Sequence, residues 1–136
     1  MILNCLLFLL IGICMYSIVQ KISISKLKDN AKEFFEKNKG TYYFLTRYGK
    51  KPHTSFDYSN KDENIYFIFG KESTGIPPKI LKPYLDKCMR MPMTDKVRAL
   101  NLSNTVAIMV YEVLRQQNYE GLLFKEPHKS EDFIIE

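Results

Sequence analysis

Short apolar runs, separated by polar segments that contain glycine or proline, make up most of the chain. Ile22–Ser25 alternates between apolar and polar residues, which is typical of a strand. Thr41–Thr46 is aromatic and β-branched, and Ile65–Phe69 is apolar throughout. Each of these runs predicts a strand, the last one buried on both faces. A further short strand is predicted within 88–93.

Two short helices are predicted between these strands. Asp29 or Asn30 can cap a helix over Ala31–Lys37. The run Pro77–Leu81 begins with two prolines, which suit the first turn of a helix. The polar stretch 47–64 contains glycine and proline and is expected to be a loop.

A longer helix is expected near the C-terminal end. Ser103 or Asn104 is expected to cap it, and it continues to Gln117. Its apolar residues at helical spacing are Leu102, Val106, Val110, Val113 and Leu114. Residues 107–109 make the first two turns apolar nearly all round, so this part is predicted to be buried on several sides, as in a core or a subunit interface. Strands alternating with helices predict an α/β fold, with a mostly parallel sheet flanked by helices.

The first 20 residues follow a different pattern. Ile2–Val19 is almost continuously apolar, and no charge precedes Lys21. About 18 such residues reach the lower limit for spanning a bilayer, and the lysines that follow favour a cytoplasmic C-terminal side. Three interpretations stay open: a membrane anchor, a buried segment, and a start that is not the natural one. We favour the third.

Composition limits the classes of function. A chain of 136 residues forms one compact domain, and its net charge of +5 is compatible with an RNA partner without requiring one. Cys5, Cys14 and Cys88 form no C-x-x-C pair, so neither a zinc site nor a disulfide framework is indicated. His53 and His128 are isolated and are expected to be surface histidines.

The segment Gly70–Gly75 follows the apolar strand and could hold a ligand. Ile76 and Pro77 stand where a phosphate-binding loop would have Lys and Ser or Thr, so a nucleotide triphosphatase is disfavoured. Glycine lets the backbone approach a ligand at the carboxyl end of a strand, where open α/β sheets bind ligands. Three other segments have this character: Leu45–Thr46, Met91–Met93 and Arg98–Asn101.

The segments Ile65–Pro77 and Val97–Glu112 together resemble the C-terminal signature of the SPOUT class of S-adenosylmethionine-dependent RNA methyltransferases. Within that class the chain is most similar to the tRNA (cytidine(34)-2'-O)-methyltransferases, which methylate the 2'-hydroxyl of the wobble nucleotide. The resemblance implies a SPOUT-like domain over 21–125 with a C-terminal trefoil knot, between the atypical segment 1–20 and a tail over 126–136. It also implies S-adenosyl-L-methionine as cofactor, the tRNA anticodon loop as partner, a homodimer and a cytoplasmic location.

The resemblance also assigns site residues. Carried over by motif, the cofactor contacts are Leu45, Gly70, Met91 and Ala99. The family usually has serine at the position of Ala99. The resemblance assigns no catalytic residue. Asn101, which precedes the expected cap, and Tyr111, two turns into the helix, are candidates from their positions alone. Tyr111 could face a subunit interface or the substrate, or pack in the core. Glu72 and Arg98 could shape the site or contact RNA, with a solvated surface charge as the alternative for each. No metal site is implied.

One motif of the family has no counterpart in the sequence. The family carries an asparagine-glycine-arginine motif near its N-terminus, whose arginine is thought to assist the reacting hydroxyl. No N-x-G-x-x-R occurs here, and no arginine precedes Arg47. We therefore expect methyl transfer by this chain to be impaired. Two alternatives stay open: a non-catalytic remnant that binds cofactor or RNA, and a membrane-tethered protein.

Overall fold

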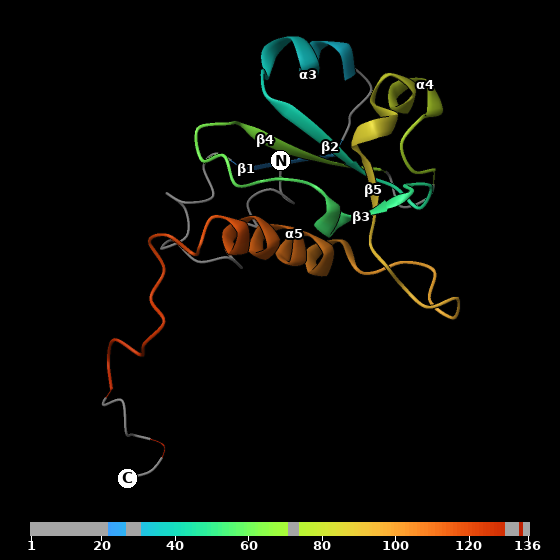
Figure 1. Cartoon of the computed structure of the whole chain (residues 1–136). Coiled ribbons are helices and arrows are strands. Elements are labelled where there is room, and N and C mark those ends of the chain that lie inside the picture. The colour runs from blue at the N-terminus through green and yellow to red at the C-terminus, as the bar shows by residue number, and fades with distance from the viewer. Residues whose placement is uncertain (1–21, 27–30, 71–73, 130–133, 135–136) are drawn as a thin grey trace.

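The computed structural model describes residues 22–26, 31–70, 74–129 and 134 (Figure 1). Within these residues the strands are β1 (Ile22–Lys26), β2 (Thr41–Leu45), β3 (Lys51–Pro52), β4 (Ile65–Phe69) and β5 (Cys88–Arg90). The α-helices in the same part of the chain are α3 (Ala31–Lys37), α4 (Pro78–Leu81) and α5 (Leu102–Gln116). Two 3-10 helices, η2 (His53–Ser55) and η3 (Lys82–Lys87), follow β3 and α4.

All five strands belong to one parallel sheet in the order β1-β4-β2-β5-β3. In register, Leu45 at the end of β2 pairs with Phe69 at the end of β4 and with Met89 in β5. The carboxyl ends of these three strands therefore lie at the same edge of the sheet. The predicted α/β fold with a mostly parallel sheet is confirmed.

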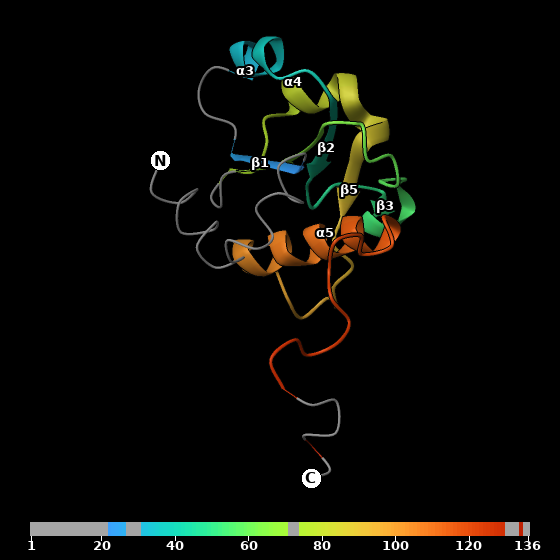
Figure 2. The ribbon, with the colours of Figure 1, turned by 90° about the vertical axis from the view of Figure 1, so that its left-hand side faces the viewer.

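Helices cover both faces of the sheet. The views in Figures 1 and 2 place α3 and α4 on one face and α5 on the other. Successive residues of a strand point to opposite faces. Phe44 and Ile68 accordingly belong to the apolar cluster with α4, while Tyr43 and Phe67 belong to the cluster with α5. This two-sided burial explains why β4 is apolar along its whole length.

The helix α5 buries one face only. Four of its five predicted core residues are fully buried, and Leu102 is half-buried. Met109 is also buried, but Ala107 and Ile108 are exposed. A position in the core of the chain is therefore wrong for Ala107 and Ile108, because the sheet covers α5 from one side. Their burial in a subunit interface, the other possibility, stays a prediction.

Two boundaries also differ from the prediction. The stretch 47–64, expected to be a loop, contains β3 and η2, and β5 ends at Arg90 rather than near Pro92. Both residues of β3 are exposed, so this strand leaves no apolar pattern in the sequence. None of the helices in the described parts of the chain is long and apolar enough to cross a membrane. The Ile2–Val19 segment lies outside the described residues.

The C-terminal end of α5 is fastened to the segment that follows β3. The Gln116 side-chain amide donates to the Phe56 carbonyl at 2.9 Å and accepts from the Tyr58 backbone N–H at 2.7 Å. Gln117 donates to the Tyr58 carbonyl at 2.9 Å, and the buried Tyr58 hydroxyl donates to the His53 carbonyl at 2.7 Å. The helix thus satisfies backbone groups of an otherwise irregular segment.

Glu112 and His53 are titratable groups in this contact. Glu112 is buried on α5 and accepts two hydrogen bonds of 2.9 Å from Arg115 and one of 2.8 Å from Gln116. The bonds from Arg115 hold the Glu112 pKa below its usual value. His53 is half-buried rather than a surface residue as expected, and its buried Nδ1 has no hydrogen-bond partner among the described residues. Burial lowers the His53 pKa, against an opposing effect of Glu112.

These shifts predict acid sensitivity. An unfolded chain would protonate His53 near pH 6.5 and Glu112 near pH 4.5, whereas both pKa values are lower in the folded chain. The unfolded state therefore binds more protons, and the free energy of unfolding should fall as the pH drops from about 7 to 4. Thermal melts across this range should show His53→Gln flattening the upper part of the profile and Glu112→Gln the lower part. A profile that both variants leave unchanged would contradict this assignment.

Candidate functional site

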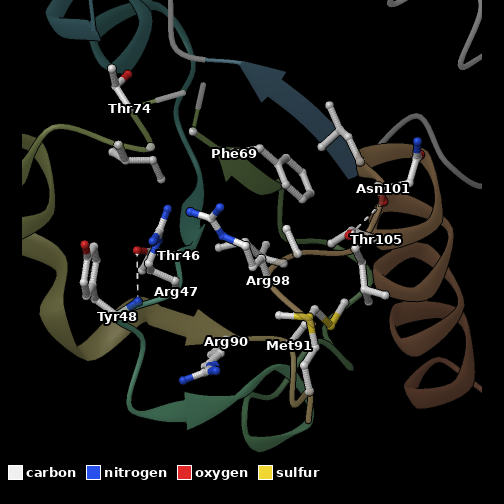
Figure 3. Close-up of a pocket in the computed structure, with 18 residues that line it drawn as sticks. Thr46, Arg47, Tyr48, Phe69, Thr74, Arg90, Met91, Arg98, Asn101 and Thr105 are labelled. Carbon is white, nitrogen blue, oxygen red and sulfur yellow. Dashed lines mark hydrogen bonds between the residues drawn. The ribbon is translucent and has the colours of Figure 1, made fainter. Parts of the chain in front are cut away.

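A pocket of about 590 Å³ opens at the carboxyl edge of the sheet (Figure 3). It is built by the segments that follow β2, β4 and β5 and by the loop that leads into α5. Its lining residues are Leu45–Tyr48, Phe69–Gly70, Thr74–Ile76, Arg90–Met91, Met93, Arg98–Leu102 and Thr105. This is the edge at which open α/β sheets bind ligands.

The four residues expected to contact a cofactor lie together in this pocket. Leu45, Gly70, Met91 and Ala99 come from four separate segments, and each of them lines it. Met91 is buried, Leu45 is half-buried and Ala99 is exposed. Their contact with a cofactor stays a prediction, but the structure gives them the shared location that such contacts require.

Gly70 is required by a close approach of two backbones. A Cβ at this position would lie 2.4 Å from the Gly75 carbonyl carbon and 2.6 Å from its Cα. Gly75 itself has φ +70°, which suits glycine, and a Cβ there would meet nothing within 4 Å. The backbone at Gly70 and at Gly75 can therefore lie this close only because Gly70 has no side chain.

A second close approach fixes the turn after β2. A Cβ at Gly49 would lie 2.3 Å from the Met89 carbonyl carbon and 2.8 Å from the Arg90 nitrogen. The Thr46 N–H donates to the Met89 carbonyl at 3.0 Å, and the Gly49 N–H donates to the Thr46 carbonyl at 3.2 Å. This turn, which carries Arg47, is thereby pressed against β5.

Asn101 caps α5, contrary to the prediction of Ser103 or Asn104. Its side-chain oxygen accepts from the Ser103 N–H at 2.8 Å, while its carbonyl accepts from the Thr105 N–H and hydroxyl at 3.0 and 3.1 Å. The helix consequently begins at Leu102. Asn101 also lines the pocket (Figure 3), so capping places it there and explains its position without a catalytic role.

Tyr111 does not lie with Asn101. Its side chain is 55% exposed, and it is not among the lining residues. Core packing, the alternative role for this residue, is thus wrong. The structure does not bring the two catalytic candidates together within one chain. Glu72 lies outside the described residues.

Sequence reasoning missed two cationic residues of the pocket. Arg47 and Arg90 line it together with Arg98, which the sequence had already indicated. The sequence could have indicated them by their positions at strand ends, because Arg47 follows β2 by two residues and Arg90 is the last residue of β5. Only the order of strands in the sheet brings these two positions to one place.

The pocket offers backbone groups, apolar side chains, hydroxyls and guanidinium groups. Within the described parts of the chain no three His, Cys, Asp or Glu side chains are grouped to hold a metal ion. Cys88 is buried on the sheet face that packs against α4, its Sγ lies 3.3 Å from the Tyr84 carbonyl oxygen, and burial raises the pKa of its thiol. The thiol therefore has the character of a core residue rather than of a nucleophile.

Sequence comparisons connect the chain to known proteins. The pattern of the SpoU rRNA Methylase family matches residues 17–111. A Bacillus subtilis (strain 168) protein, provisionally named a tRNA (cytidine(34)-2'-O)-methyltransferase, is 53% identical over 95 residues, which cover 69% of this chain and 59% of that protein. A Geobacillus stearothermophilus protein of the same provisional name is 52% identical over 95 residues, with coverages of 69% and 60%.

Solved structures agree with these relatives. A crystal structure from Bacillus anthracis, provisionally described as an RNA methyltransferase, superposes with a TM-score of 0.66 at 52% identity and covers 72% of this chain and 62% of that one. Another, whose description concerns 2-OH methylation of C/U34 on tRNA, gives a TM-score of 0.57 at 28% identity, with coverages of 68% and 55%. This chain belongs to the SpoU rRNA methylase family. It spans about three-fifths of the length of these two curated relatives.

The Gly70 contact leads to a stability prediction. Gly70→Ala forces a Cβ against the Gly75 backbone, which cannot rotate away as a side chain would. Overpacking of this kind costs about 1–3 kcal/mol, so chemical denaturation should show a decrease of that size. Thr74→Ala, an exposed position in the same loop, is the matched control and should change the free energy of unfolding by less than about 0.5 kcal/mol. Equal effects of the two variants would show that the contact does not constrain the loop.

Proposed function

We propose that the pocket binds S-adenosyl-L-methionine and that the protein transfers its methyl group to the 2'-hydroxyl of the tRNA wobble nucleotide at position 34. The observation that carries this proposal is the convergence of Leu45, Gly70, Met91 and Ala99 on one pocket in a chain of the SpoU family. The names of its relatives give the substrate, and the cofactor follows from the resemblance to S-adenosylmethionine-dependent enzymes.

The residues present fit such a cofactor. A volume of about 590 Å³ lies in the range of pockets for ligands of this size. Leu45, Met91 and Met93 supply apolar surface for a nucleoside, and the backbone at Ala99 and Leu100 supplies polar groups for it. The bound cofactor would supply an activated methyl group with a good leaving group. The chain's own contribution is then to hold and orient the two reactants, since alignment accounts for much of such a rate enhancement.

The proposal concerns the activity of a whole enzyme, and this chain spans about three-fifths of its relatives. The impaired transfer expected from the missing arginine motif stays a prediction. Binding and transfer can be measured separately, so an impaired but folded chain would still bind the cofactor. A non-catalytic protein would bind the cofactor as the proposed enzyme does, but it would show no methyl transfer.

The finer features implied by the family are part of the same proposal. These are a trefoil knot in the C-terminal part, a cytoplasmic location and a homodimer. The exposed face of α5 supports the homodimer, because Ala107, Ile108 and Tyr111 form an apolar strip on the side away from the sheet. Tyr111 would then lie in the subunit interface, which gives this catalytic candidate a route to a partner's pocket.

Cofactor binding is tested by calorimetric titration with S-adenosylhomocysteine, the product of the reaction. One saturable site per chain is expected. Met93→Asp places a carboxylate in the half-buried lining and should weaken binding at least tenfold, since burying an unpaired charge is costly. Leu85→Asp is the control at an exposed position outside the lining and should leave binding unchanged. A folded chain that shows no saturable binding would contradict the proposal.

Methyl transfer is measured separately, as 2'-O-methylcytidine formed in an anticodon stem-loop RNA.

The homodimer is tested by sedimentation. Ile108 is 39% exposed, so Ile108→Glu should leave the fold intact but place two like charges near each other across an α5 interface. The variant should sediment as a monomer at concentrations at which the unmodified chain is a dimer. Leu123→Glu, at a 75% exposed position beyond α5, is the control. An unmodified chain that sediments as a monomer would contradict the interface.

A further inference from the structure

Arginine is distributed unevenly over the molecule. The sequence contains four arginines and sixteen lysines. Three of the four arginines, Arg47, Arg90 and Arg98, line the pocket, whereas none of the described lysines does. The described lining also contains no Asp or Glu. The mild basic excess of the whole chain does not account for this, because it is carried mainly by lysine.

The three arginines reach the pocket from separate segments. Arg47 follows β2, Arg90 ends β5, and Arg98 lies in the loop before α5. Figure 3 shows the Arg98 side chain extending into the pocket from this loop. The fourth arginine, Arg115, lies outside the pocket and is bound to Glu112 at 2.9 Å.

These three side chains are not neutralised within the described residues. None of the ion pairs found there involves Arg47, Arg90 or Arg98. Arg47 makes one further contact, with its guanidinium carbon 5.8 Å from the centre of the Tyr48 ring. All three residues are exposed, so solvent and salt screen the repulsion between them, but an anion bound in the pocket would still be attracted to all three charges.

The residue type narrows the anion. A guanidinium group presents a planar fork of N–H donors that matches two oxygens of a carboxylate or a phosphate. Lysine supplies charge without this geometry. The selection of arginine over the more abundant lysine therefore indicates an oxyanion recognised by shape as well as by charge.

We propose that Arg47, Arg90 and Arg98 form an oxyanion-binding site in the pocket. Its ligand is either a backbone phosphate of an RNA or the carboxylate of the cofactor's amino-acid part. The choice between these two ligands rests on the proposed function, whereas the anion site itself does not.

The test uses the full chain and single variants Arg47→Gln, Arg90→Gln and Arg98→Gln. Arg98→Lys keeps the charge but removes the fork. Lys79→Gln is the control, because Lys79 is exposed on α4 and outside the lining. The anion site is read directly by NMR, as sulfate-dependent shifts of the arginine Nε–H signals. These shifts should saturate in the unmodified chain and weaken in each Gln variant, but not in Lys79→Gln.

Two further titrations identify the ligand. If the site holds the carboxylate, Arg98→Gln should weaken S-adenosylhomocysteine binding about tenfold or more. Binding of 5'-methylthioadenosine, which lacks the amino-acid part, should stay unchanged. If the site holds a phosphate, binding of an anticodon stem-loop RNA should weaken, and its dependence on salt should become shallower by about 0.7 for each phosphate that the variant no longer binds. Arg98→Lys should restore little of either affinity.

The outcomes separate this inference from the proposed function. An unmodified chain that binds sulfate through these arginines, but neither S-adenosylhomocysteine nor RNA, would keep the anion site and overturn the proposed function. Binding of sulfate, S-adenosylhomocysteine and RNA that is unaffected in all three Gln variants would overturn the anion site and leave the proposed function standing. The anion site would also be overturned if the unmodified chain showed no saturable sulfate-dependent shifts and the Gln variants bound S-adenosylhomocysteine and RNA as the unmodified chain does.

Discussion

Parallel pairing of the strands is the constraint on which the rest of the structure depends. Because all neighbouring strands run in one direction, the segments that follow β2, β4 and β5 leave the sheet at one edge. Three loops that are far apart in the sequence are thereby brought around a single pocket. The same pairing leaves two faces to be covered, which α3 and α4 do on one side and α5 on the other (Figures 1 and 2).

The helix α5 connects the pocket wall with the segment that follows β3. Its N-terminal end is set by Asn101, which also belongs to the pocket wall. Its C-terminal end holds the segment 53–58 through Gln116 and Gln117. Between these ends Val106, Met109, Val110 and Val113 pack against the sheet. Packing of the helix and shaping of the pocket are consequently parts of one structural element.

The sequence predicts the elements that are buried on two sides. The aromatic and apolar runs of β2 and β4 stand out because both of their faces meet a core. The predicted cofactor residues also come together, since strand ends of a parallel sheet must meet. Other features depend on spatial neighbours. Residues 51–52 form a strand through β5 alone, although both side chains are exposed.

The N-cap shows a second limit of sequence reasoning. Asn101, Ser103 and Asn104 are all favourable caps. The choice among them is made by the backbone, which is extended at Asn101, with φ −55° and ψ 138°, before the helix begins. His53 is a similar case, because Glu112, the charged group that acts on its pKa, lies far from it in the sequence. Pocket residues such as Arg47 and Arg90 are likewise brought together by strand order and not by any local motif.

Gly49 has a consequence for how this site can change over evolution. The turn that carries Arg47 is positioned by backbone atoms. The backbone of Met89 and Arg90 lies against the Gly49 α-carbon, which carries no side chain. These backbone contacts do not involve the side chains at 47, 48 and 90, and the Thr46 hydroxyl adds one side-chain bond within the turn, accepted from the Tyr48 N–H at 3.3 Å. Residues at 47, 48 and 90 can be exchanged to suit a different ligand while the scaffold stays as it is, whereas position 49 tolerates no such exchange.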